Sequence, residues 1–190
     1  AKSELKLANW KLGFQFSLWE FNQLKPSKFE EKKRYMKEMF AECGENCYIK
    51  LPFCANWGGK NLHFGNNVYA NFNLTVVDDG DIYVDDKVMF GPNVTIATAN
   101  HPIEPGLREN AMQYNKPVHI CENVVAVRNP CRVLREIGEH DKEYFYKNKK
   151  STGKILFNAV FHNSGEHIIN GATHFFLEIF FYFQYPLPPI

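Results

Sequence analysis

The chain has 190 residues, which is enough for one folded domain with an appendage. Its 22 Lys and Arg almost balance its 21 Asp and Glu, and the net charge of +1 argues against a nucleic-acid partner. The sequence shows neither a targeting signal nor an apolar run of the roughly 20 residues that a membrane helix needs. Five cysteines in such a chain predict reduced thiols and a cytoplasmic location.

Residues 1–46 are predicted to form an N-terminal helical segment. Leu18, Trp19 and Phe21 are expected on a helix that packs against the rest of the domain, and residues 22–25 interrupt it. Such helices cover the end of a repeat protein, where an uncovered strand would leave backbone groups unpaired.

A second helix is predicted to begin at Ser27, because Ser27 and Glu30 have the spacing of a capping box. Gly44 is expected to end it. Its apolar stripe contains Phe29, Met36, Met39, Phe40 and Cys43.

Residues 47–128 are predicted to form a parallel β-helix. Within residues 62–100 an aliphatic residue leads each group of six, with a two-residue insertion at Gly80 and Asp81; these leaders are Leu62, Val68, Leu74, Ile82, Val88 and Val94. A six-residue period fits neither an α-helix nor a simple alternating strand, and it is typical of stacked coils. Residues 47–61 are expected to form a first, irregular coil, with Gly58 and Gly59 at a corner.

The six-residue period lapses in a loop from residue 98 to 116 and resumes at Val118 and Val124. Residues 129–150 are predicted to form a C-terminal helix with Pro130 in its first turn. Residues 151–190 form an aromatic-rich tail without an assigned fold. Three interpretations of it remain open: out-of-frame or read-through sequence, a cover over the coil, and an interfacial membrane anchor, although the basic face of such anchors is missing.

Several stretches resemble the galactoside and maltose O-acetyltransferases of the hexapeptide-repeat superfamily. They include YANFNLTVVDD (69–79), GPNVTIATANHPI (91–103) and NPCRVLREI (129–137), and the resemblance covers about residues 17–147. It implies a left-handed β-helix, usually a homotrimer with active sites between subunits. It also implies transfer of an acetyl group from acetyl-CoA to a hydroxyl of a galactoside, maltose or glucose, without a metal ion.

The resemblance assigns roles to particular residues. His101 matches the catalytic histidine, and an imidazole suits the general base that an alcohol nucleophile requires. Asn71, Asp79 and Asn56 match positions that contact the acceptor sugar, although Asn and Asp are also the residues that tight corners prefer. Arg132 and Arg135 match arginines near the CoA phosphates, which a guanidinium binds well.

Some features depart from the family pattern. After Val118 the family continues with about two further coils, so roughly 35 residues of the CoA-binding surface are absent here. Residues 1–12 contain no recognisable acidic sugar contact. Met112 stands where a glutamate is common in the family, and Glu109 is the nearest carboxylate in sequence that could orient His101.

Other functions compete with the acetyltransferase. The main rival is a catalytically impaired or inactive β-helix remnant with a sugar-binding or structural role. A carbonic anhydrase on the same fold would need three zinc ligands, for which His63, His101 and His119 are available, but the surrounding motifs are those of acetyltransferases. Cys43 and Cys47 lack the spacing of a structural zinc site.

Overall fold

The computed structural model describes residues 2–127, 131–146 and 149–150. The tail 151–190 and the predicted helix start at Pro130 lie outside these residues.

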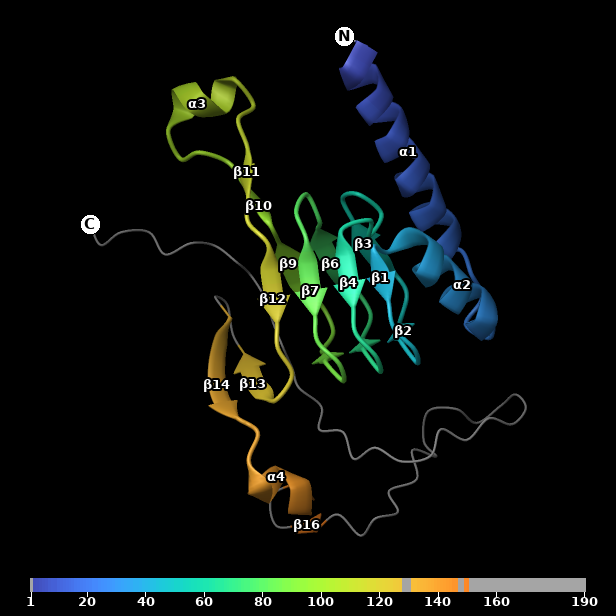
Figure 1. The fold of residues 1–190 in the computed structure, drawn as a ribbon, viewed down its shortest axis with the longest axis vertical. Helices are drawn as coiled ribbons and strands as arrows, with labels where there is room; N and C mark the ends of the chain where they lie inside the picture. Colours follow the sequence, from blue (N-terminus) through green and yellow to red (C-terminus); the bar gives the residue numbers. More distant parts are fainter. Residues whose placement is uncertain (1, 128–130, 147–148, 151–190) are drawn as a thin grey trace.

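Two helices pack at one end of the coil, as predicted: α1 (Lys2–Asn22) and α2 (Phe29–Met39) (Figure 1). Leu18 and Phe21 of α1 are buried in the core, whereas Trp19 is 58% exposed. The capping box at Ser27 is wrong, because a turn closed by the hydrogen bond from Lys28 N to Lys25 O delays the helix. Lys28 is the N-cap residue, and its side chain makes no capping hydrogen bond.

The second helix also ends earlier than predicted. It stops at Met39, and Phe40 adopts an extended backbone. The next residues, Glu42–Cys43, form strand β1, which pairs with a strand of the next coil. This tertiary pairing takes Cys43 out of the helix, and the β-helix therefore begins inside the segment predicted as helical.

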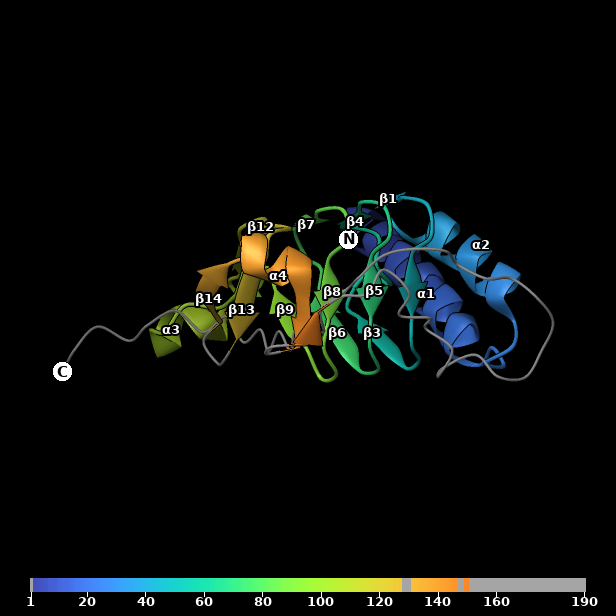
Figure 2. The same ribbon diagram turned by 90° about the horizontal axis from the view of Figure 1, so that it is seen from below.

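The coil has three faces of parallel strands. Face A contains β1 (Glu42–Cys43), β4 (Leu62–Phe64), β7 (Ile82–Val84) and β12 (Val118–Ile120). Face B contains β2 (Tyr48–Ile49), β5 (Tyr69–Ala70) and β8 (Met89–Phe90). Face C contains β3 (Phe53–Ala55), β6 (Leu74–Val77) and β9 (Thr95–Ala97). Figure 2 shows the strands of face A in a row along one side of the coil.

The six predicted leaders form the core of the coil. Each is at most 5% exposed: Leu62, Val68, Leu74, Ile82, Val88 and Val94. Equivalent residues stack from coil to coil, as Phe53 does on Leu74 in the face C register. At the end near the helices, Phe40 packs edge-on against Phe53 with ring centroids 5.6 Å apart.

Several corners carry residues that tolerate positive φ, and this was predicted for Gly58 and Gly59. Asn73 and Asn93 have φ of 62° and 59°, and their side-chain amides are hydrogen-bonded at 2.9 Å. Gly58 and Gly59 have φ of 68° and 90°. Asn is one of the few residues with a side chain that enters this region readily, so stacked asparagines shape the turns.

An arm leaves the coil after face C (Figure 1). It consists of β10 (Ala99–Asn100), α3 (Pro105–Glu109) and β11 (Tyr114–Asn115), and β10 pairs antiparallel with β11. The arm returns the chain to face A, where β12 pairs with β7 in the parallel register.

The chain then leaves the parallel pattern. β13 (Val124–Val127) pairs antiparallel with β14 (Arg132–Glu136), and α4 (Glu139–Glu143), β15 (Tyr144–Tyr146) and β16 (Lys149–Lys150) follow. The prediction of a helix through residues 129–150 is therefore wrong for β14. Its apolar residues have no core to cover, since Val133 and Leu134 are each 62% exposed, and pairing with the β-branched strand β13 decides its conformation.

None of the helices in the described ranges has the length and apolar character needed to cross a bilayer.

Candidate active site

Polar side chains gather where the strands of face C end. Asn56 follows β3, Asp79 comes shortly after β6, and His101 follows β10 just beyond β9. Because parallel strands stacked in register end at one edge of the face, these residues share one corner of the coil.

Asp79 is the centre of a hydrogen-bonded cluster at this corner. Its Oδ2 accepts from Asn56 Nδ2 at 2.8 Å, and its Oδ1 accepts from Trp57 Nε1 at 3.0 Å. Burial alone would raise the pKa of Asp79, but hydrogen bonds from Trp57, Asn56 and Gln113 outweigh it and lower the pKa. The structure thus keeps a half-buried carboxylate ionised and oriented.

Asp78, which sequence reasoning did not single out, supports this cluster from inside. Its side chain is fully buried and accepts hydrogen bonds from the backbone N–H groups of Trp57 at 2.7 Å and Gly59 at 3.0 Å. Burial raises its pKa, while these amide bonds act in the opposite direction. The two consecutive aspartates therefore have different roles. Asp78 stabilises the corner from inside, and Asp79 holds an oriented carboxylate at its surface.

His101 lies exposed at the base of the arm. Its Nδ1 is 2.8 Å from the carbonyl oxygen of Met112. A carbonyl can only accept, so Nδ1 carries the proton, and in the neutral ring Nε2 has the free lone pair. The orienting group is thus a backbone carbonyl rather than the carboxylate sought at Glu109, and the side chain at position 112 is not needed for it.

The arm joins His101 to the aspartate cluster. Gln113, next to Met112, hydrogen-bonds the Asp79 side chain, and Asn115 Nδ2 donates to the Asp79 carbonyl at 2.8 Å. The structure therefore joins Asn56 directly to Asp79 and links His101 to this pair through the arm.

Asn71 lies elsewhere. It follows β5, at the end of face C where the strands begin, and its Oδ1 accepts from Phe72 N at 3.0 Å. The intervening strand β6 alone spans roughly 10 Å, at about 3.3 Å per residue. A single sugar cannot bridge Asn71 and Asp79 of the same chain.

The two predicted CoA-contacting arginines lie on β14, where both are exposed. The Arg135 guanidinium forms a fork with Asp141, with N–O distances of 2.6 and 2.7 Å. Asp141 also accepts from Gly138 N at 2.9 Å, so this pair closes the turn before α4. Arg135 is already engaged within the chain.

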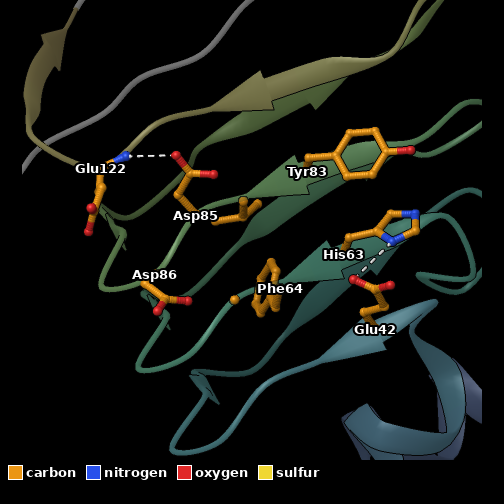
Figure 3. A pocket seen from close by; sticks show the side chains of 9 residues that line it. Glu42, His63, Phe64, Tyr83, Asp85, Asp86 and Glu122 are labelled. Atoms are coloured by element: carbon orange, nitrogen blue, oxygen red, sulfur yellow. Dashed lines mark hydrogen bonds and ion pairs between the residues drawn. The ribbon is translucent and has the colours of Figure 1, made fainter.

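A separate hollow of about 410 Å³ lies on face A and contains none of the predicted site residues. Glu42, His63, Tyr83, Asp85 and Glu122 are among its lining residues (Figure 3). His63 is 3.5 Å from Glu42 and 3.1 Å from Asp81, and its ring stacks on Tyr83 at 4.5 Å.

The three histidines considered for zinc do not converge. His63 and His119 stack on opposite sides of Tyr83 on face A, whereas His101 binds the arm. In the part of the chain that the structure describes, no group of three His, Cys, Asp or Glu residues could hold a metal ion.

Comparison with known proteins gives clear relatives. The chain is 59% identical over 107 residues to a galactoside O-acetyltransferase of Lactococcus lactis, a match that takes in 56% of this chain and only 52% of that protein. It is 36% identical to the galactoside O-acetyltransferase of Escherichia coli, over 73% of this chain and 84% of that protein. That match spans 172 positions, but 73% of this 190-residue chain supplies fewer residues than that. Part of the relative within the match therefore has no counterpart here.

Solved structures agree with the sequence matches. A galactoside acetyltransferase in complex with coenzyme A superposes with a TM-score of 0.67 at 34% identity, over 76% of this chain and 89% of that chain. A maltose O-acetyltransferase from Clostridium difficile superposes with a TM-score of 0.63 at 26% identity, over 70% of this chain and 89% of that chain. No family model matches the sequence. Both the fold and the relatives establish that this chain, a left-handed parallel β-helix, belongs to the galactoside O-acetyltransferase family of hexapeptide-repeat proteins.

Proposed function

We propose that this protein transfers an acetyl group from acetyl-CoA to a hydroxyl group of a sugar of the galactoside, maltose or glucose type. The observation that carries the proposal is the pairing of His101 Nδ1 with the Met112 carbonyl, which leaves Nε2 as a base at the solvent-exposed end of face C. The family to which the chain belongs supports the reaction type.

His101 acts as the general base in a direct transfer. Its Nε2 removes the proton of the acceptor hydroxyl while that oxygen attacks the thioester carbonyl, because an alcohol is a weak nucleophile without such help. The C–O bond forms, the C–S bond breaks, and the imidazolium returns the proton to the departing CoA thiolate. The Met112 carbonyl stabilises the imidazolium through Nδ1, and no acyl-enzyme is formed.

The acceptor sugar is held from two sides. Asp79 and Asn56 offer hydrogen-bonding groups next to His101, since Asp79 is ionised and held in place by its neighbours. Asn71 lies at the opposite end of β6, so it reaches this site only from another copy of the chain. We therefore infer a homotrimer whose sites lie between subunits, as closed cyclic symmetry allows. The free state of all five cysteines fits a cytoplasmic enzyme.

Acetyl-CoA is the co-substrate, and Arg132 and Arg135 are the candidates for its phosphates. Arg132 is exposed on β14 and suits this task as a planar donor. Arg135 would have to exchange its fork with Asp141 for a phosphate. Of the two, Arg132 is thus the better candidate.

The alternative is a catalytically impaired β-helix that retains a sugar-binding or structural role. The observation that favours it is the early end of the parallel coil: the chain turns from β12 into the antiparallel β13–β14 pair. In a solenoid, surface is added coil by coil, so a loss of coils reduces the area available to a long ligand such as CoA.

The test is acetyl transfer by the full chain to a panel of galactosides, maltose and glucose, with the acetylated sugar detected by mass spectrometry. We expect turnover in the native protein, a loss of about 100-fold or more in His101→Ala, and no loss in the control His119→Ala. Calorimetric titration with CoA separates the two functions. If the native protein neither acetylates any sugar nor binds CoA, only the impaired β-helix fits.

A further inference from the structure

Two cysteines flank the first corner of the coil. Cys43 is the last residue of β1, and Cys47 immediately precedes β2. Both pack against the hydrophobic core without being fully enclosed. Cys43 stands in register with Phe64 of the next coil, so the pair occupies inward positions that elsewhere hold apolar residues.

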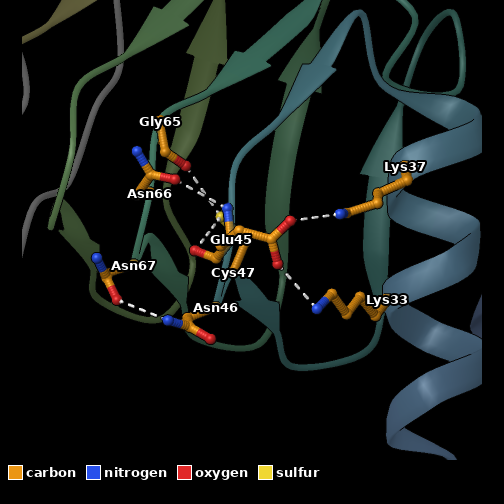
Figure 4. Close-up of polar contacts among 8 residues, drawn as sticks. All are labelled: Lys33, Lys37, Glu45, Asn46, Cys47, Gly65, Asn66 and Asn67. Carbon is orange, nitrogen blue, oxygen red and sulfur yellow. Dashed lines mark hydrogen bonds and ion pairs between the residues drawn. The ribbon is translucent and has the colours of Figure 1, made fainter.

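The two thiols lie close enough across the corner to shift each other's pKa in opposite directions. Cys43 donates a hydrogen bond to the sulfur of Cys47, and this bond lowers the pKa of Cys47 to about 7 against the opposing effect of burial. The same bond, together with burial, raises the pKa of Cys43. When Cys47 is protonated, its Sγ donates to the Gly65 carbonyl at 3.0 Å (Figure 4). One thiol of the pair is therefore acidic, and its partner is adjacent and protonated.

The corner that carries the pair is held firmly. Glu45, between the two cysteines, binds Lys33 at 2.9 Å and Lys37 at 2.7 Å, which ties the corner to α2 (Figure 4). A Cβ on Gly44 would meet the Gly65 carbonyl oxygen at 2.4 Å, so the corner is also packed tightly on the next coil. These contacts hold in place the backbone corner that both cysteines flank.

The other three cysteines lack this setting. Cys54 and Cys121 are exposed, and Cys131 is partly buried, which raises its pKa to about 11. Reactivity towards oxidants follows the fraction of thiolate and the presence of a resolving thiol rather than exposure alone.

We propose that Cys43 and Cys47 form a peroxide-reactive dithiol that closes reversibly into a disulfide across the first corner of the coil. The Cys47 thiolate attacks one oxygen of a hydroperoxide, the O–O bond breaks, and Cys47 becomes a sulfenic acid. The departing hydroxide or alkoxide takes from solvent the proton that the Cys47 thiol gave up, and leaves as water or an alcohol. The Cys43 sulfur then attacks the Cys47 sulfur, the S–O bond breaks, and the departing hydroxide takes the Cys43 proton as water. The two thiols supply both electrons that reduce the peroxide. The disulfide joins β1 to β2 beside α2, and a dithiol reductant reopens it.

Peptide mapping tests the proposal directly. Trypsin releases both cysteines in the peptide 38–50 (EMFAECGENCYIK) and Cys54 in the separate peptide 51–60. After one equivalent of hydrogen peroxide, then alkylation under denaturing conditions, we expect peptide 38–50 to lack both alkyl groups and the mass of two hydrogen atoms. Cys54 should remain alkylated, and dithiothreitol before alkylation should restore both groups. Full alkylation of 38–50, or earlier oxidation of Cys54 or Cys121, would overturn the proposal.

Variants separate the two roles. In Cys43→Ser the sulfenic acid on Cys47 has no partner, so dimedone should trap it there. In Cys47→Ser, dimedone should leave Cys43 unmodified, and Cys54→Ser should behave as the native chain. Dimedone on Cys43 in the Cys47→Ser variant, or a disulfide between two chains in the native protein, contradicts the assigned roles.

Discussion

Subunit complementation gives the sharpest test of a site shared between copies. Asn71 and His101 lie at opposite ends of face C, so in the proposed homotrimer each complete site would take Asn71 from one subunit and His101 from its neighbour. Asn71→Ala should cost about ten- to a hundredfold in turnover through a lost hydrogen bond, and His101→Ala about a hundredfold or more. Asn71→Ala alone then keeps at most about 10% of native activity, and His101→Ala alone at most about 1%.

The expected gain on mixing comes from counting. When the two variants assemble at random in equal amounts, half of all sites receive position 71 from a His101→Ala subunit, whose Asn71 is intact. In half of those sites the neighbouring subunit is Asn71→Ala and supplies an intact His101. About one quarter of all sites in a closed ring are therefore complete. Co-expressed subunits should therefore recover about a quarter of native activity. The two variants assembled separately and then mixed in equal amounts should give at most about 5%.

The matched control uses residues from one corner. Asp79 and His101 come from the same subunit, since Gln113 and Met112 of one arm contact both. Mixing Asp79→Ala with His101→Ala should recover nothing. The assay is acetylated sugar per subunit after co-expression with two affinity tags. Equal activity in the two mixtures would refute a site divided between copies.

Three further predictions concern stability. Leu74→Ala, in a fully buried position stacked on Phe53, should lower the free energy of unfolding in urea by about 3 kcal/mol, against less than about 0.5 kcal/mol for the exposed Leu134→Ala. Asp78→Asn places an amide N–H against a backbone donor and should cost about 2 kcal/mol in the same assay. Bonds from Lys37 and Lys33 lower the pKa of Glu45 from 4.5 to about 2; its stabilisation is complete above pH 4.5 and disappears as pH falls to 2, so the melting-temperature difference from Glu45→Gln should vanish over that range.

The coil could be predicted because its signals are periodic and local. A leader every six residues, with Asn73 and Asn93 before two of them, specifies a buried stack and its corners without knowledge of any distant contact. Where long-range pairing competes with a local signal, the prediction failed. The capping box at Ser27 yielded to a turn, and β14 formed on β13 although a helix was predicted over residues 129–150.

The candidate site was predictable as a list of residues but not as an arrangement. Asn56 and Asp79 meet because β3 and β6 stack in register, and His101 follows the end of β9 at the same edge, which the six-residue period implies. The sequence could not indicate the role of the Met112 carbonyl, because every residue carries a backbone oxygen whatever its type. The separation of Asn71 from Asp79 results from the length of β6. In the proposed homotrimer, this separation assigns the two residues of one site to different subunits.

The corner that carries Asp79 is independent of the chain beyond β12 for a physical reason. Each coil rests only on its neighbours, so the chain beyond β12 does not alter the stacking of β3, β6 and β9 that positions Asp79 and His101. The β12–β7 register is intact, with Val118, His119 and Ile120 opposite Ile82, Tyr83 and Val84. In the proposed enzyme, a loss of coils after β12 would therefore act on the acetyl-CoA surface and on subunit contacts made there. The CoA affinity and the trimer stability of this chain should both be lower than those of relatives that keep these coils. The sugar contacts within one corner should persist.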